Sequence, residues 1–295
     1  MNLLISDIFL LTITLIALIF ASITDIKKRE VPNWLSFSLM VIALAIRAFA
    51  ALTTSQHHYF YYALIALVLF FLLSSILYYT KFFAGGDAKL LIALAIIFAT
   101  TPSYLPETEL TKTIDIFSKP FLLSFLINVF AIGSIYSFIF IIFFAIKNKK
   151  KFSKEFEKVF NRTKTLRISF LALAFISLMV SFFFNIFFFI FALTLIFPYI
   201  YIITKATENI SMIKKVSAYE LTEGDWLVEK IKLKNKIIKP SVHGLSLEEI
   251  KLLKKSNKKV LIKYGIPFVP VFLISLICTI LLGDLFILVI KGLFF

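Results

Sequence analysis

The chain has 295 residues, of which 60% are hydrophobic, and its mean hydropathy is +0.94. A soluble chain of this length would carry polar residues between its core segments, whereas here the polar residues and the net charge of +15 are confined to a few blocks. The single cysteine, Cys278, excludes an intrachain disulfide and a Cys-x-x-Cys metal site. This composition predicts an all-helical protein that crosses a membrane several times.

Eight apolar stretches are candidates to cross the ~30 Å of hydrocarbon in a bilayer. In chain order they cover residues 3–24, 35–52, 59–79, 88–101, 120–146, 168–184, 186–204 and 267–290. The apolar run from Ile168 to Thr204 is too long for one span, so we expect a break near Asn185 and a tight helical hairpin. The sequence therefore predicts a bundle of about eight transmembrane helices.

The polar blocks divide the chain into four expected parts. These are a first set of four spans over 1–101, further spans over 102–204 with a basic cytoplasmic loop at 147–167, a cytoplasmic segment over 205–264, and a last span over 265–295. Each boundary falls where the composition changes from apolar to charged. The main polar part is therefore a small insertion before the last helix.

The insertion has local signals of both strand and helix. Alternation of apolar residues from Trp226 to Ile238 predicts a β-hairpin that turns near Asn235. Ser246 and Glu249 have the spacing of a capping box, which predicts a short helix that runs to about Lys259. The expected fold is a helical bundle with a small cytoplasmic α+β insertion.

The distribution of Lys and Arg predicts the orientation in the membrane. If residues 27–29 are cytoplasmic, the inner connections hold all but four of the 32 Lys and Arg residues. The other four are Arg47, Lys112, Lys119 and Lys291. Because basic loops stay on the inner side, we expect an outside N-terminus, a retained first helix, and a multi-pass protein of the cell membrane. We expect Arg47, near the outer end of the second span, to reach the lipid headgroups, and the basic surplus to attract anionic lipid rather than nucleic acid.

Two aspartates lie at the edges of apolar spans that this topology brings to the same side of the membrane. Asp25 ends the first span, and Asp87 follows Gly85 and Gly86 and precedes the fourth. Ionisable residues at membrane depth are costly and commonly functional. Two adjacent carboxyl groups share one proton, so one can accept a proton from water while the other donates to a carbonyl oxygen. The pair therefore indicates hydrolysis by acid and base catalysis, without a cofactor or a metal.

Other roles for the same residues remain open. Asp87 is also suited to capping a helix, Asp25 to pairing with the basic residues 27–29, and Pro32 and Asn33 to opening the second helix. A proton- or cation-coupled transporter would use Asp25 and Asp87 as ion-binding carboxylates. An assembly scaffold without catalysis is a third possibility.

A short motif surrounds each aspartate. The first motif is Asp25 followed by Val31, Pro32 and Asn33, and the second is Gly85, Gly86, Asp87, Ala88, Lys89 and Leu90. Together they resemble the paired signature of type IV prepilin peptidases, in which one aspartate precedes Ile/Val-Pro-Asn and the other lies in a Gly-x-Gly-Asp or Gly-Gly-Asp turn before x-Lys-Leu. The resemblance implies that Asp25 and Asp87 are catalytic. It implies a supporting role in the turn and substrate site for Gly85, Gly86, Lys89, Pro32 and Asn33.

The tail of the chain is similar to archaeal preflagellin and prepilin-like peptidases at Glu223–Asp225, Gly244–Ile250 and Gly265–Pro270. That branch lacks the cysteine-rich loop and the N-methyltransferase activity of many bacterial relatives. The resemblance implies cleavage of class III signal peptides from prepilin-like or preflagellin substrates at the cytoplasmic face. The eight expected spans exceed the six usual in the archaeal branch.

The remaining chemistry-bearing residues offer fewer options. His57, His58 and His243 fall in predicted loops and no His-Glu-x-x-His motif is present, which excludes serine–histidine and zinc-dependent intramembrane proteolysis. Four acidic residues of the insertion are candidates to bind a basic leader peptide or simply form a solvated face. They are Glu220, Glu223, Asp225 and Glu229.

Overall fold

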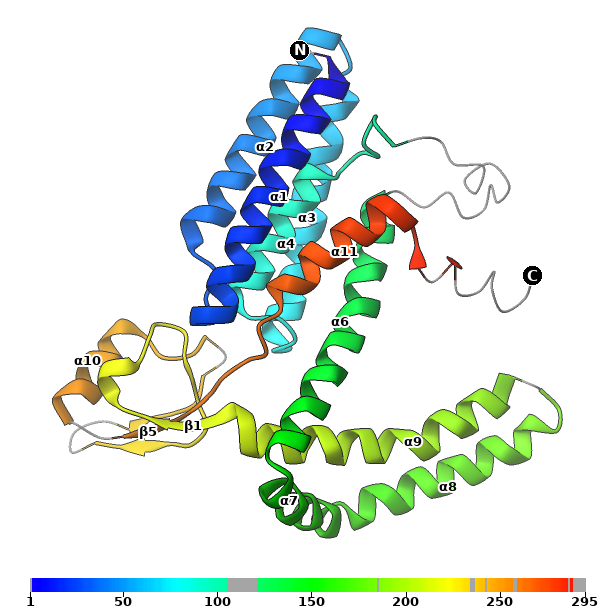
Figure 1. Cartoon of the computed structure of the whole chain (residues 1–295), viewed down its shortest axis with the longest axis vertical. Coiled ribbons are helices and arrows are strands. Elements are labelled where there is room, and N and C mark those ends of the chain that lie inside the picture. Colours follow the sequence, from blue (N-terminus) through cyan, green and yellow to red (C-terminus); the bar gives the residue numbers. More distant parts are fainter. Residues whose placement is uncertain are drawn as a thin grey trace. The chain divides into compact units, whose positions relative to one another are not determined.

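The computed structural model describes residues 2–105, 121–184, 186–233, 237–241, 243–256, 259–285 and 287–288. The chain forms two compact units (Figure 1). The first comprises residues 1–136 and 265–295, and the second comprises residues 137–264. The end of the chain thus returns to the unit in which the chain begins.

The first unit is a helical bundle. Its helices are α1 (Leu3–Lys28), α2 (Asn33–Thr54), α3 (His58–Tyr79), α4 (Gly85–Ile97), the beginning of α6 (Phe121–Lys147) and α11 (Val269–Leu282). Helix α4 packs against α1, α2 and α3, and α11 packs against α1. Every apolar side chain of α4 from Ala88 to Ile97 is buried, so this short helix is the centre of the bundle.

The apolar stretches predicted from the sequence coincide with helices. Six helices among the described residues are long and apolar enough to cross a membrane: α1, α2, α3, α6, α8 (Lys164–Ser181) and a segment over Ile190–Met212. The predicted all-helical, multi-pass membrane fold is therefore confirmed. Helices α4 and α11 have only 13 and 14 residues, or about 20 Å at ~1.5 Å per residue. The orientation in the membrane stays a prediction.

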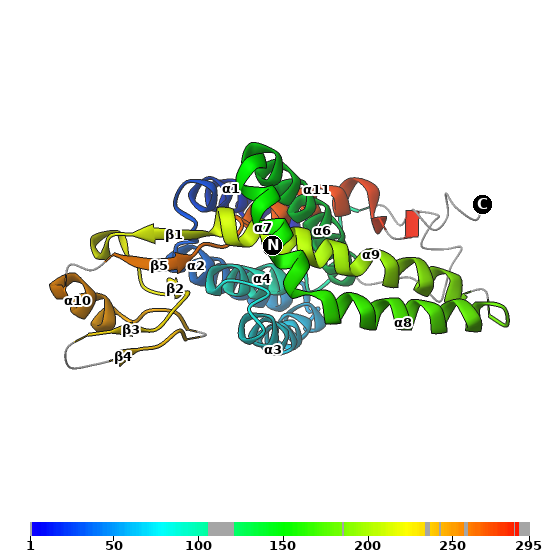
Figure 2. The ribbon, with the colours of Figure 1, turned by 90° about the horizontal axis from the view of Figure 1, so that it is seen from below.

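The second unit combines long helices with a small sheet. After the end of α6 it contains α7 (Lys149–Arg162), α8, α9 (Ile186–Thr207) and a π-helical turn (Glu208–Met212). Next come β1 (Ile213–Val216), a 3₁₀ turn (Ala218–Glu220), β2 (Trp226–Leu227), β3 (Ile231–Lys232), β4 (Ile237–Ile238), α10 (Leu247–Ser256) and β5 (Val260–Lys263). Strand β5 lies between β1 and β2 and is antiparallel to both, as Figure 2 shows. The predicted α+β insertion is present.

The predicted hairpin and capping box are present, but Trp226 and Leu227, which we expected in the hairpin, form β2 and pair with β5. Strands β3 and β4 pair antiparallel as the expected hairpin. In the capping box, the Ser246 amide donates to Glu249 Oε2 at 3.0 Å and the Glu249 amide donates to Ser246 Oγ at 3.3 Å. The predicted turn at Asn235 and the predicted break at Asn185 lie outside the described residues.

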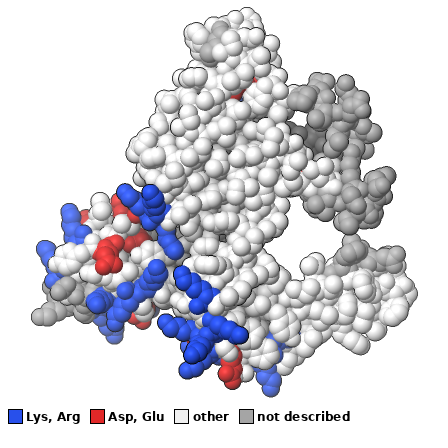
Figure 3. Space-filling view, in the orientation of Figure 1, with Lys and Arg blue, Asp and Glu red and all other residues white. Residues whose placement is uncertain are grey.

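Helix α7 replaces a loop that we expected between residues 147 and 167. Phe152, Phe156 and Phe160 recur every four residues, which places them on one face of a helix. They pack against Ile202 and Ala206 of α9. The high density of Lys in this segment obscured that spacing, because a charged stretch between two spans is normally read as a solvated connection. Figure 3 shows Lys and Arg gathered over the second unit, whereas the visible surface of the bundle is almost free of them.

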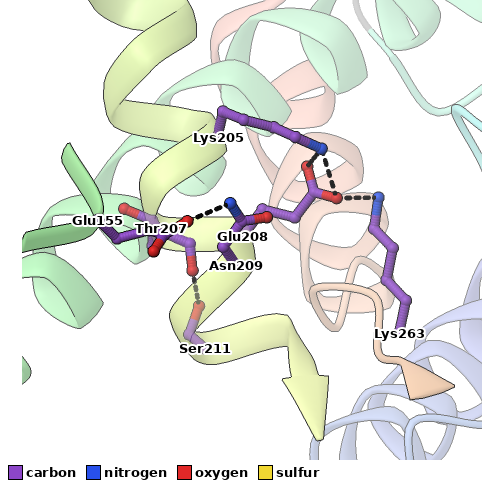
Figure 4. A network of polar contacts seen from close by, with 7 residues as sticks. All are labelled: Glu155, Lys205, Thr207, Glu208, Asn209, Ser211 and Lys263. Atoms are coloured by element: carbon purple, nitrogen blue, oxygen red, sulfur yellow. Dashed lines mark hydrogen bonds and ion pairs between the residues drawn. The ribbon is translucent and has the colours of Figure 1, made fainter. Parts of the chain in front are cut away.

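A polar network joins the helices of the second unit to its sheet (Figure 4). Glu208, in the π-helical turn, accepts hydrogen bonds from Lys205 at 3.2 Å and forms an ion pair with Lys263 of β5 at 2.8 Å. The next residue, Asn209, donates to Glu155 of α7 at 2.9 Å. One turn of chain therefore links α7, α9 and β5 within this unit.

Arg47 does not reach the headgroups, so that prediction was wrong. Its side chain is fully buried in the first unit, where the guanidinium donates to the carbonyl oxygens of Tyr59 at 2.9 Å and Ile97 at 2.7 Å and to Thr100 Oγ1 at 3.1 Å. The guanidinium also lies 4.1 Å from the centroid of the Tyr59 ring. These partners come from three separate parts of the chain, so the buried guanidinium joins α2 to the start of α3 and the end of α4.

Candidate active site

The structure brings Asp25 and Asp87 together. Asp25 lies in the last turn of α1, and Asp87 is the third residue of α4; these two helix ends lie at the same end of the first unit (Figure 1). The side chains are 6% and 7% exposed, and the two carboxylates are close enough to interact electrostatically. Two acidic groups from distant parts of the sequence therefore lie within electrostatic range of one another in a buried site.

Asp87 also stabilises the start of its own helix. Its carboxylate accepts a hydrogen bond from the Ala84 amide at 3.3 Å, which satisfies one of the free donors at the helix N-terminus. Gly85 and Gly86 form the first turn of α4, whereas we expected them in a turn before the helix. The actual turn lies just upstream, where Lys81 adopts a left-handed conformation with φ of 61°.

The two glycines have different neighbours. A Cβ atom on Gly86 would lie 2.9 Å from Cβ of Val31, closer than real Cβ atoms come to their neighbours. A Cβ atom on Gly85 would meet only Tyr78, at an ordinary 3.6 Å. Gly86 is therefore the residue that allows the start of α4, with Asp87, to approach the Val-Pro-Asn segment after α1.

The two sequence motifs touch each other. Lys89 Nζ donates to Asn33 Oδ1 at 2.7 Å, and the ammonium lies 5.7 Å from the centroid of the Phe37 ring. Pro32 precedes the first residue of α2, Asn33, as expected for a helix opening. Together with the close approach of Gly86 to Val31, this hydrogen bond holds the start of α4 against the segment that follows Asp25.

A further segment reaches the site from the far end of the chain. The Val269 amide, the first of α11, donates to Asp25 Oδ2 at 2.9 Å. Arg29 of the same unit and Tyr136 of α6 also lie within electrostatic range of Asp25. Our sequence reasoning gave residues 265–270 no part in the site and missed this contact. The only sequence signal for it is the resemblance over residues 265–270.

The other predicted candidates lie elsewhere. Among the acidic residues of the insertion, Asp225 accepts a hydrogen bond from the Thr222 amide at 2.8 Å, so it shapes its own turn. Glu220, Glu223 and Glu229 are exposed on the second unit. The three histidines are also exposed.

Comparison with known proteins gives one match. A family model described as the type IV leader peptidase family matches residues 12–149, just under half of the chain. No curated protein and no solved structure matches the chain. The matched range contains both aspartates and both motifs, and it ends before the second unit's sheet begins.

Proposed function

We propose, from the match of residues 12–149 to the type IV leader peptidase family, that the chain is a membrane-embedded aspartic endopeptidase that cleaves prepilin-type leader peptides. The observation that carries the proposal is the buried pair of Asp25 and Asp87. Stability alone gives no reason to bury two acidic groups face to face.

In the proposed reaction the two carboxyl groups share one proton. The ionised carboxylate accepts a proton from a water molecule, whose oxygen attacks the carbonyl carbon of the scissile peptide bond. The protonated carboxyl group donates its proton to the carbonyl oxygen. The tetrahedral intermediate then collapses: one of its hydroxyl groups returns a proton to the ionised carboxylate as the C=O bond re-forms, the C–N bond breaks, and the leaving nitrogen receives a proton from the protonated carboxyl group. No covalent intermediate with the protein is needed, and the shared proton belongs to the pair rather than to either residue.

The surroundings of the pair support this role. Gly86 and the Lys89–Asn33 hydrogen bond hold α4 against the segment that follows Asp25. A pair of catalytic groups needs this kind of support because small displacements of reacting groups cost large factors in rate. Gly85, Gly86, Lys89, Pro32 and Asn33 are thus proposed to support the site rather than to react.

The substrate and the side of cleavage form the finer part of the proposal. We propose that cleavage takes place at the cytoplasmic face and removes class III signal peptides from prepilin-like or preflagellin proteins, which retain their hydrophobic helix. The concentration of Lys and Arg in the connections on the Asp25 side supports this orientation. Neither the described residues nor the comparisons favour the transporter alternative.

The test is cleavage of a prepilin-type substrate by the purified chain in liposomes. Asp25→Asn and Asp87→Asn should each abolish cleavage, by about 10³-fold or more, while the protein remains folded. Glu30→Gln is the matched control, because it neutralises an exposed acid close to Asp25 in sequence and should leave cleavage intact. Cleavage that persists in either aspartate variant overturns the proposal. Ion uptake by wild-type protein without cleavage of any leader peptide would support a transporter instead.

A further inference from the structure

The chain segment 265–269 is tied to the end of α1 at two points. At one end of the segment, Arg29 Nη1 donates to the Gly265 carbonyl oxygen at 2.8 Å. At the other end, the Val269 amide donates to Asp25 Oδ2. Both anchors on α1 lie within a single helical turn, so the segment runs directly past the acidic pair.

The Val269 amide is held in place by tight packing. Val269 is fully buried, and the ring of the preceding Phe268 packs against Phe83 and Phe272 with centroid distances of 5.1 and 5.6 Å. A Cβ atom on Gly133 of α6 would lie 2.7 Å from the Phe268 ring, so the absence of a side chain there makes room for this ring. The amide is therefore a fixed donor.

We propose that the Val269 amide is a positioning group of the peptidase, a conclusion that rests on the proposed function. It donates to Oδ2 of Asp25, next to the amide of Phe268, and so restricts the rotation of the carboxylate relative to Asp87 and water. A hydrogen bond from an N–H group to an ionised carboxylate is short and strong, and its geometry restricts the orientation of the carboxylate. Because residue 269 lies outside the matched range 12–149, the active site of this chain is completed by a segment beyond the family's matched region.

The direct test is Val269→Pro, which removes the donor and keeps an apolar side chain at the first position of α11. Phe268 has α-region backbone angles, which a following proline disfavours, so folding of this variant is measured first. Compared with wild type, kcat should fall by about 10- to 100-fold with KM little changed. The acidic limb of the pH–rate profile should also move to higher pH, because the ionised form of Asp25 loses a hydrogen bond. The other charged or titratable groups that face Asp25 are Asp87, Arg29 and Tyr136, and all three are retained.

Val269→Ala is the companion variant, since it keeps the amide and removes packing. It should keep the wild-type pH–rate profile, whatever its loss of overall rate. A wild-type kcat and pH–rate profile in folded Val269→Pro overturns the inference and leaves the proposed function standing. Absence of cleavage by the wild-type protein would instead overturn the proposed function itself. Failure of the inference and failure of the proposed function are therefore distinguishable.

If Val269→Pro does not fold, a second pair of variants tests whether segment 265–269 positions Asp25. Arg29→Met removes the other anchor of the segment, and Lys28→Met removes the same charge from the neighbouring exposed position. Arg29→Met should lower kcat several-fold more than Lys28→Met does. Equal kcat values for the two variants overturn the inference.

Discussion

Helix α1 carries a buried aspartate near each end, and the two are held in opposite ways. Near its beginning, Asp7 accepts hydrogen bonds from the Tyr59 hydroxyl and from the amide and hydroxyl of Ser103, and it lies within electrostatic range of Arg47. Near its end, Asp25 accepts the Val269 amide and faces a second carboxylate. Both side chains are 6% exposed.

Burial therefore does not distinguish the two residues, whereas their partners do. Asp7 is surrounded by donors and by a cation, which is the arrangement expected of a charge that ties helices together. Asp25 lies opposite another acid, an arrangement that costs stability and that a chemical role explains. Our sequence reasoning singled out Asp25 and overlooked Asp7, because only Asp25 lies near a recognised motif.

The largest expected effect separates the two aspartates, because removing the charge of Asp25 should abolish cleavage whereas removing the charge of Asp7 should lower stability. Asp25→Asn should lose cleavage by about 10³-fold or more with little change in stability. Asp7→Asn should retain cleavage per folded molecule and lower the free energy of unfolding by about 1–3 kcal/mol, because it removes the buried charge that accepts hydrogen bonds from Tyr59 and Ser103. Cleavage assays and thermal unfolding in the same detergent measure both quantities. Loss of cleavage in well-folded Asp7→Asn would remove the distinction between the two ends.

The next prediction concerns the partner of Asp7. Arg47→Met should also destabilise the protein, by about 1–3 kcal/mol for each buried carbonyl oxygen that it leaves without a donor, and it removes the cation within electrostatic range of Asp7. The double variant Asp7→Asn/Arg47→Met should lose less than the sum of the single losses, since each removes the same interaction. Additive losses in chemical unfolding experiments would show that the two charges act independently.

At the start of α4, near the end of α1, substitution of the two adjacent glycines by alanine should have different effects. Gly86→Ala should cost about 1–3 kcal/mol of local packing and reduce cleavage by about tenfold or more, because the new Cβ collides with Val31. Gly85→Ala should be tolerated and is the matched control, since the position is helical and has space for a methyl group. Val31→Gly should restore cleavage to Gly86→Ala. Failure of this rescue would show that another contact excludes a side chain at residue 86.

The smallest expected effect is on the bond between the motifs. Lys89→Met and Asn33→Ala should each reduce cleavage a few-fold, consistent with a partly exposed hydrogen bond that contributes about 0.5–1.5 kcal/mol. The double variant should be no worse than the more impaired single variant. A double variant whose loss equals the product of the two single losses would mean that Lys89 and Asn33 act separately.

Local features were predictable because their signals lie within a few residues. The hairpin of β3 and β4 follows from alternation, and the capping box follows from the spacing of Ser246 and Glu249. Helix α7 was predictable in principle from the spacing of Phe152, Phe156 and Phe160, which we did not use. Each of these depends on helical or strand periodicity and on nothing remote in the chain.

Sequence alone determined that this is a multi-pass helical membrane protein, where most of its apolar helices lie, and which two aspartates deserve a catalytic proposal. Hydropathy and short motifs carry that information because they are properties of contiguous residues. Only the tertiary structure decided that Arg47 is buried, that Gly86 rather than Gly85 admits the close approach to Val31, and that the Val269 amide reaches Asp25. These contacts join residues far apart in the chain, so packing of the helices, and no local pattern, creates them.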